Sequence, residues 1–121
     1  MSRPLLDQSR LHPAIRDTVE HLHAEVVHNV QAASMSNAVL VVGMSGNPFC
    51  KRARKALDVA AVPHHYLEYG SYLSQWRQRL ALKMWSGWPT FPLVFVKGVL
   101  IGGADDLAKL IASGELKRLL A

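Results

Sequence analysis

The sequence predicts an α/β domain with a mixed four-stranded sheet flanked by helices, and two stretches of the chain carry this prediction. The apolar run 39–42, a helical stretch at 48–60 and a second strand at 65–69 form a strand–helix–strand unit, in which the two strands pair in parallel. Two further apolar runs, 93–96 and 99–101, are separated by only two residues, which is typical of an antiparallel hairpin.

A long N-terminal helix precedes the first strand. It is predicted to run from Pro13, which suits a first helical position, to about Ala33. Its apolar stripe must be buried on its own domain, which the pattern favours, or in a homodimer. We therefore expect residues 1–34 to form an extension with an amphipathic helix and residues 35–121 to form the main domain. The residues at helical spacing are Ile15, Val19, Leu22, Val26 and Val30.

Three more helices are expected after the first strand. The helix at 48–60 begins at a good N-cap, Asn47, followed by a proline. The next helix is predicted to be capped by Ser71, and a last helix runs from about Asp105 to Ser113-Gly114. Apolar residues at helical spacing mark one face of each: Ala53, Ala56, Leu57 and Ala60 in the first; Leu73, Trp76, Leu80 and Met84 in the second; Leu107, Leu110 and Ile111 in the third.

Composition limits the function classes. The chain has 121 residues, a hydrophobic fraction of 50% and a formal net charge of +5, which suits one compact domain and anionic partners. No block of about five or more like charges occurs, so a nucleic-acid interface is not favoured. The N-terminus lacks the apolar region of a secretion signal and no apolar run approaches about 20 residues, so we expect a cytoplasmic protein without a membrane span.

The single cysteine, Cys50, is the most informative residue. One cysteine excludes an intrachain disulfide, so any disulfide must join it to a small thiol or to another chain. It is predicted to lie in the first turn of a helix, where unpaired N–H groups and nearby cations lower a thiol pKa. Burial behind Phe49 would raise that pKa instead. A reactive thiol and an inert, buried one both remain open.

The histidines do not predict a metal site. His21, Glu25 and His28 share one predicted helical face, and His64 and His65 are adjacent. Metal sites need three or four convergent ligands, and no cysteine accompanies these residues. A solvated helix face and a strand edge explain them better, so no metal is expected.

Three sequence motifs that follow the first strand together resemble the glutaredoxin family, which has the thioredoxin-like fold. A strand is followed by Asn47-Pro48-Phe49-Cys50 at a helix start, then by Thr90-Phe91-Pro92 before a hairpin, then by a Gly-Gly-x-Asp-Asp sequence at 102–106. The resemblance covers roughly residues 38–120. Trp88-Pro89, and the helix before the first strand, are similar to the monothiol branch.

The resemblance implies a glutathione site and a role in redox electron transfer as a disulfide oxidoreductase. A cis peptide bond before Pro92 would let the backbone of Phe91 pair with the cysteinyl unit of glutathione. Asp105 would meet the ammonium of the γ-glutamyl end, and Arg79 would hold the glycyl carboxylate. Simpler alternatives are a helix N-cap for Asp105 and a solvated surface charge for Arg79. The implied glutathione-binding set is Asn47, Phe49, Arg79, Phe91, Pro92, Gly103, Ala104 and Asp105, with Cys50 as the catalytic residue.

The sequence also departs from the family pattern. The family motif begins with the nucleophilic cysteine, and Asn47 occupies that position in the ungapped alignment, which places Cys50 at the second, resolving position. A rival alignment equates Cys50 with the nucleophile but needs a shortened loop and helix. The family's lysine before the loop is also missing.

Two functions follow from the resemblance and the departures. The first is glutathione-dependent thiol–disulfide exchange on protein substrates by a monothiol route through Cys50, with weak activity. The second is a module that binds glutathione or a partner without turnover. A [2Fe–2S] cluster is not favoured, because relatives hold it with the first cysteine, and Asn47 has no sulfur.

Overall fold

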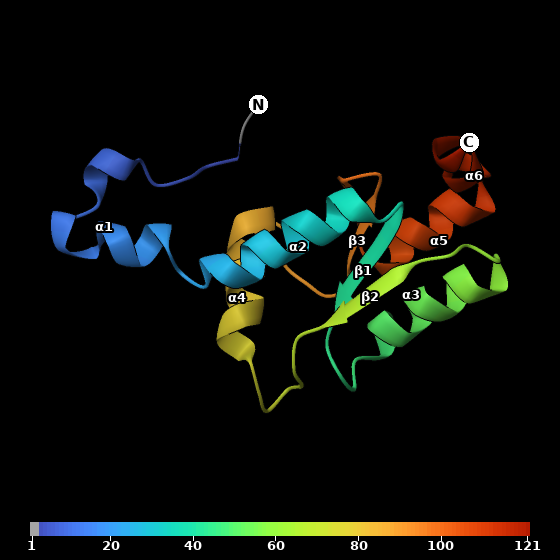
Figure 1. Ribbon diagram of the computed structural model, residues 1–121, viewed down its shortest axis with the longest axis horizontal. Helices are drawn as coiled ribbons and strands as arrows, with labels where there is room; N and C mark the ends of the chain where they lie inside the picture. Colours follow the sequence, from blue (N-terminus) through green and yellow to red (C-terminus); the bar gives the residue numbers. More distant parts are fainter. Residues whose placement is uncertain (1–2) are drawn as a thin grey trace.

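The four predicted strands form one mixed sheet in the computed structural model of the protein, which describes residues 3–121 (Figure 1). The strands lie in the order β2-β1-β3-β4. Strand β1 pairs with β2 in parallel and with β3 antiparallel, and β3 pairs with β4 antiparallel. The predicted fold class is therefore confirmed. The bounds are β1 Val39–Gly43, β2 His65–Glu68, β3 Leu93–Val96 and β4 Val99–Gly102.

Helices cover both faces of this sheet (Figure 1). Because side chains alternate along a strand, Leu40 and Val42 of β1 pack toward α2 and α4, whereas Val39 and Val41 pack toward α3 and α5. No helix within residues 3–121 has the length and apolar character that crossing a bilayer requires. The helices are α1 Pro13–Glu20, α2 Ala24–Ser36, α3 Pro48–Val59, α4 Trp76–Ser86, α5 Ala104–Ala112 and α6 Glu115–Leu120, after a 3₁₀ turn at Gln8–Arg10.

The predicted continuous N-terminal helix is wrong, because the chain breaks it into α1 and α2. His23 adopts a left-handed backbone with φ of 45°, which no residue inside an α-helix does. The break lets α2 bury Val30 in the core, while Ile15 and Val19 of α1 stay exposed. Helix α2 continues past residue 34, so the predicted domain boundary falls inside a helix that packs on the sheet.

Helix α4 begins later than predicted and buries a different face. Ser71 does not cap it: its Oγ accepts from the Leu73 N–H in a separate turn, and Gln75, with φ of 54°, precedes the helix. The face predicted from apolar spacing is exposed. The buried residues of α4 are instead Arg79, Ala81 and Leu82. Arg79 is therefore not the solvated surface charge that its type suggested.

The predicted hairpin turn is confirmed. Lys97 and Gly98, between β3 and β4, have φ values of 48° and 81°, and positive φ at both central residues defines the tight turn that suits twisted strands. Gly102 at the end of β4 pairs with Val94 near the start of β3, and the start of β3 pairs with the carboxyl end of β1, so α5 begins at this same end of the sheet. This part of the fold brings the Gly102–Asp106 segment to the side of the molecule that holds Cys50.

Candidate functional site

Asn47 caps the helix that carries the thiol. Its side-chain Oδ1 accepts from the backbone N–H groups of Phe49, at 2.8 Å, and Cys50, at 3.2 Å. Pro48, which has no N–H to satisfy, takes the first helical position. The N–H donors at this helix end, where an anion would be stabilised, are therefore partly occupied by an amide oxygen of the chain itself.

The sulfur of Cys50 is buried. The residue is 1% exposed and packs with Met44, Phe91 and other apolar side chains of the core. Gly43 leaves room for it: a Cβ added there would lie 2.8 Å from the Cys50 Sγ and 2.9 Å from the Tyr66 hydroxyl. The glycine at the end of β1 thus accommodates a sulfur that points into the protein.

Burial also decides the chemistry of this thiol. Loss of hydration raises the pKa of Cys50 above its ordinary value, and the nearby Glu68 carboxylate raises it further. The Met44 backbone N–H and the Arg54 guanidinium lower this pKa but do not outweigh burial. Of the two alternatives that the sequence left open, the structure supports the protonated, enclosed thiol.

Alkylation tests this environment directly. At pH 7.5 we expect iodoacetamide to modify native Cys50 about tenfold or more slowly than the same cysteine in denaturant, because both access and thiolate fraction are reduced. The native rate should still be increasing above about pH 9, since the folded pKa lies above the ordinary one. Intact mass against time measures both rates, and equal rates in native and unfolded protein would contradict the burial.

A groove of about 190 Å³ lies beside the helix tip, between α3, the loop before β3 and the start of α5. The Phe91–Pro92 peptide bond in this loop is cis, which confirms the expectation drawn from the resemblance. Asn47 and Cys50 are not among the lining residues, so the predicted catalytic thiol does not face the groove. Six predicted site residues line it: Phe49, Phe91, Pro92, Gly103, Ala104 and Asp105.

Three other residues line the groove and were not predicted as site residues. Trp88 and Thr90 belong to the conspicuous motif before β3, so the sequence could have identified them as groove-lining residues. Trp88 Nε1 is buried without a hydrogen-bond partner within residues 3–121. The Asp106 carboxylate accepts from the Gly103 N–H at 3.0 Å and fixes the first turn of α5.

Arg79 lies outside this lining. Its Nη1 donates to the backbone carbonyls of Tyr69, at 2.9 Å, and Ser74, at 2.6 Å, so it holds the loop between β2 and α4. No spacing rule in the sequence marks a buried arginine that pairs with carbonyls, because both partners lie in an irregular loop. Its predicted contact with a glycyl carboxylate stays a prediction.

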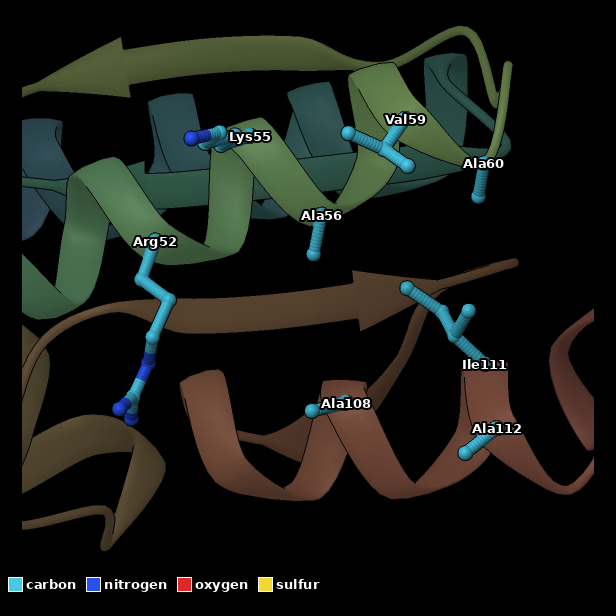
Figure 2. Close-up of a pocket in the computed structure, with 8 residues that line it drawn as sticks. All are labelled: Arg52, Lys55, Ala56, Val59, Ala60, Ala108, Ile111 and Ala112. Carbon is cyan, nitrogen blue, oxygen red and sulfur yellow. The ribbon is translucent and has the colours of Figure 1, made fainter.

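A larger, apolar groove of about 400 Å³ lies between α3 and α5 (Figure 2). Alanine, valine and isoleucine side chains form most of its wall, with Arg52 and Lys55 as the charged residues. Its lining contains no cysteine, serine, threonine, histidine or carboxylate side chain, so we assign it no catalytic role.

The acidic and histidine side chains do not extend the site. The ligand atoms of Asp17, Glu20 and His21 lie within 4.8 Å of one another, and all three residues are exposed. They belong to α1 and its C-terminal cap, at the opposite end of the molecule from α5 (Figure 1). His64 instead contacts the Val62 carbonyl through Nδ1 at 3.0 Å.

Comparison with known proteins agrees with this geometry. Residues 39–101 match the family model for glutaredoxin. A glutaredoxin-like protein of Dictyostelium discoideum is 45% identical over 102 residues, which is 84% of this chain and 83% of that protein. Glutaredoxin 4 of Haemophilus influenzae is 34% identical over 103 residues, covering 80% of this chain and 92% of that one.

Solved structures give the same result. Oxidized glutaredoxin 2 from Chlamydomonas reinhardtii superimposes with a TM-score of 0.69 at 32% identity, covering 80% of this chain and 92% of that one. A buckwheat glutaredoxin–glutathione complex superimposes with a TM-score of 0.72 at 25% identity, covering 84% and 92%. The sheet order, the cis proline and these matches lead to one conclusion: the chain belongs to the glutaredoxin family.

Proposed function

We propose that this protein binds glutathione in the groove beside α3 and carries out little or no thiol–disulfide exchange. The observation that carries the proposal is the tip of α3, where an asparagine forms the N-cap and the single cysteine is enclosed behind it. Asn47 can accept and donate hydrogen bonds, but it cannot form a disulfide. The site would then retain its binding surface without a nucleophile at the helix tip.

The shape of the groove supports glutathione as the ligand. The related buckwheat protein was solved as a glutathione complex, and the cis Pro92 and the Gly103–Asp105 segment are present here beside each other. In this proposal the Phe91 backbone pairs with the cysteinyl unit and Asp105 with the γ-glutamyl ammonium. Arg79 Nη1 already donates to two loop carbonyls, so Arg79 would contact the glycyl carboxylate through its remaining N–H groups.

The second candidate function is exchange through Cys50. Its thiolate would attack a glutathionylated protein, the substrate's S–S bond would break, and the protein thiolate would leave while Cys50 becomes glutathionylated. A second glutathione thiolate would then release oxidised glutathione and restore Cys50. The first-turn position of Cys50 and the nearby Arg54 favour this route, but the sulfur must first leave the core.

The residues at this site do not fit an iron–sulfur cluster. Thiolates are the usual protein ligands of such clusters. Asn47 has no sulfur, and the sulfur of Cys50 is enclosed among apolar side chains. A free thiol of this kind suits a reducing compartment, so the proposal places the protein in the cytoplasm, with glutathione and glutathionylated proteins as its partners.

Measurements of glutathione binding and of mixed-disulfide reduction distinguish the two candidate functions. We expect calorimetric titration to detect glutathione binding to the native protein. We also expect reduction of a glutathione mixed disulfide to proceed at the same background rate for native protein and for Cys50→Ser. After incubation with oxidised glutathione, intact mass should give no adduct on the native chain.

Two results would contradict the proposal in different ways. If the native protein does not bind glutathione, the proposed ligand is wrong. A glutathione adduct, together with turnover that Cys50→Ser abolishes, would establish exchange through Cys50 instead. Cys50→Ser is a suitable comparison because it keeps the size and removes the thiol, and its folding is checked by thermal denaturation.

A further inference from the structure

An ion pair joins α3 to α5 at the edge of the glutathione groove. Arg52 Nη2 lies 2.6 Å from Asp105 Oδ1, and both side chains are more than half exposed. The same guanidinium lies over the Phe49 ring, 5.0 Å from its centroid. Phe49 and Asp105 both line the groove, and Arg52, which does not line it, contacts both of them at its edge. Figure 2 shows the Arg52 side chain extending from α3 toward the first turn of α5.

This pair is not needed to hold the two helices together. Helices α3 and α5 already meet through buried apolar side chains, among them Ala53, Leu57 and Leu107. Exposed ion pairs contribute little to stability, because water solvates the separated charges almost as well. The pair can therefore open at low cost when a ligand offers both groups new partners.

The γ-glutamyl end of glutathione offers two such partners. Its α-carbon carries an ammonium and a carboxylate, one of each sign, whereas the proposed Asp105 contact accounts only for the ammonium. The Gly103 N–H before α5 is already used by the Asp106 carboxylate at 3.0 Å, and the other first-turn N–H groups of α5 carry only partial positive charge. The guanidinium of Arg52, placed within reach of Asp105, is the nearby cation that can bind the carboxylate in a two-point contact.

We propose that Arg52 is a specificity-determining residue that binds the α-carboxylate of the γ-glutamyl group, so that Arg52 and Asp105 together recognise its zwitterion. This inference rests on the proposed glutathione site. On binding, one protein ion pair is replaced by two protein–ligand pairs, Asp105 with the ammonium and Arg52 with the carboxylate. Ligands that lack either charge leave one protein group without its new partner.

Three tripeptides test the contact by calorimetric titration. Glutathione carries both groups, 4-aminobutyryl-cysteinylglycine lacks the α-carboxylate, and glutaryl-cysteinylglycine lacks the ammonium. We expect Arg52→Gln to weaken glutathione binding about fivefold to tenfold and to leave binding of the 4-aminobutyryl peptide unchanged. Arg52→Lys should restore part of the affinity, since it keeps the charge but loses the two-point contact.

The control is Lys55→Gln, which removes one positive charge from the same helix at a residue that does not line the glutathione groove. It should bind all three peptides as the native protein does. If Arg52→Gln binds glutathione as tightly as native protein, or weakens all three peptides equally, the inference is wrong and the proposed function stands. If native protein binds none of the peptides, the proposed function fails, and the inference fails with it.

Discussion

Replacing Asn47 with cysteine is expected to raise the rate of glutathione mixed-disulfide reduction by about two orders of magnitude or more over the native protein. The new sulfur would take the place of an Oδ1 that now accepts from the Phe49 and Cys50 N–H groups. Those donors, at the positive end of α3, would stabilise a thiolate and lower its pKa. Position 47 is 8% exposed, compared with 1% for position 50, so the new thiol also lies closer to solvent.

Two companion variants make this result specific. Asn47→Cys in a Cys50→Ser background should retain the gain, because the monothiol route needs only the new thiol and glutathione. Ser113→Cys, which adds an exposed thiol at the C-terminal cap of α5, should not gain activity. Native turnover as fast as that of Asn47→Cys, and lost in Cys50→Ser, would instead assign the nucleophile to Cys50.

Truncating Leu57 is expected to cause a large loss of stability, because this side chain fixes α3 on the sheet. Leu57 is 0% exposed and packs with Val39, Val41 and Leu107. Leu57→Ala removes buried apolar area and leaves a cavity, which should lower the free energy of unfolding by about 3 kcal/mol. Urea denaturation followed by circular dichroism measures the change.

Val59 provides the matched control from the same helix. It is 79% exposed, at the wall of the apolar groove in Figure 2, so Val59→Ala should change the free energy of unfolding by no more than about 0.5 kcal/mol. Equal losses for Leu57→Ala and Val59→Ala would mean that α3 does not pack on the sheet as described. Because α3 carries Asn47 and Cys50, its attachment also sets where the candidate site lies.

Several elements could be predicted because their determinants are local. Asn47 and Pro48 specify where α3 begins, and a helix start depends only on the few residues around it. Lys97-Gly98 specifies a two-residue turn in the same way. The motifs at the start of α3, before β3 and at the start of α5 together identified six of the nine groove-lining residues, since each motif is contiguous in the sequence.

Other elements depend on contacts that spacing does not encode. The stripe from Ile15 to Val30 is continuous in sequence, but His23 interrupts the helix so that α2 alone packs on the sheet. In α4 the apolar residues that spacing placed on the buried face, such as Trp76 and Met84, are exposed, while Arg79 is buried and donates to two loop carbonyls. Propensity and periodicity are overridden where tertiary packing supplies a better partner.

By itself, the sequence determined the fold class, the family resemblance and the absence of a thiol at the tip of α3. Those features are set by residue identity and short-range spacing. Only the tertiary structure decided that the sulfur of Cys50 is enclosed, that Asp105 is paired with Arg52, and that Arg79 holds a loop. Solvent exposure and charge pairing depend on which distant segments meet, and the chain fixes these only when it folds.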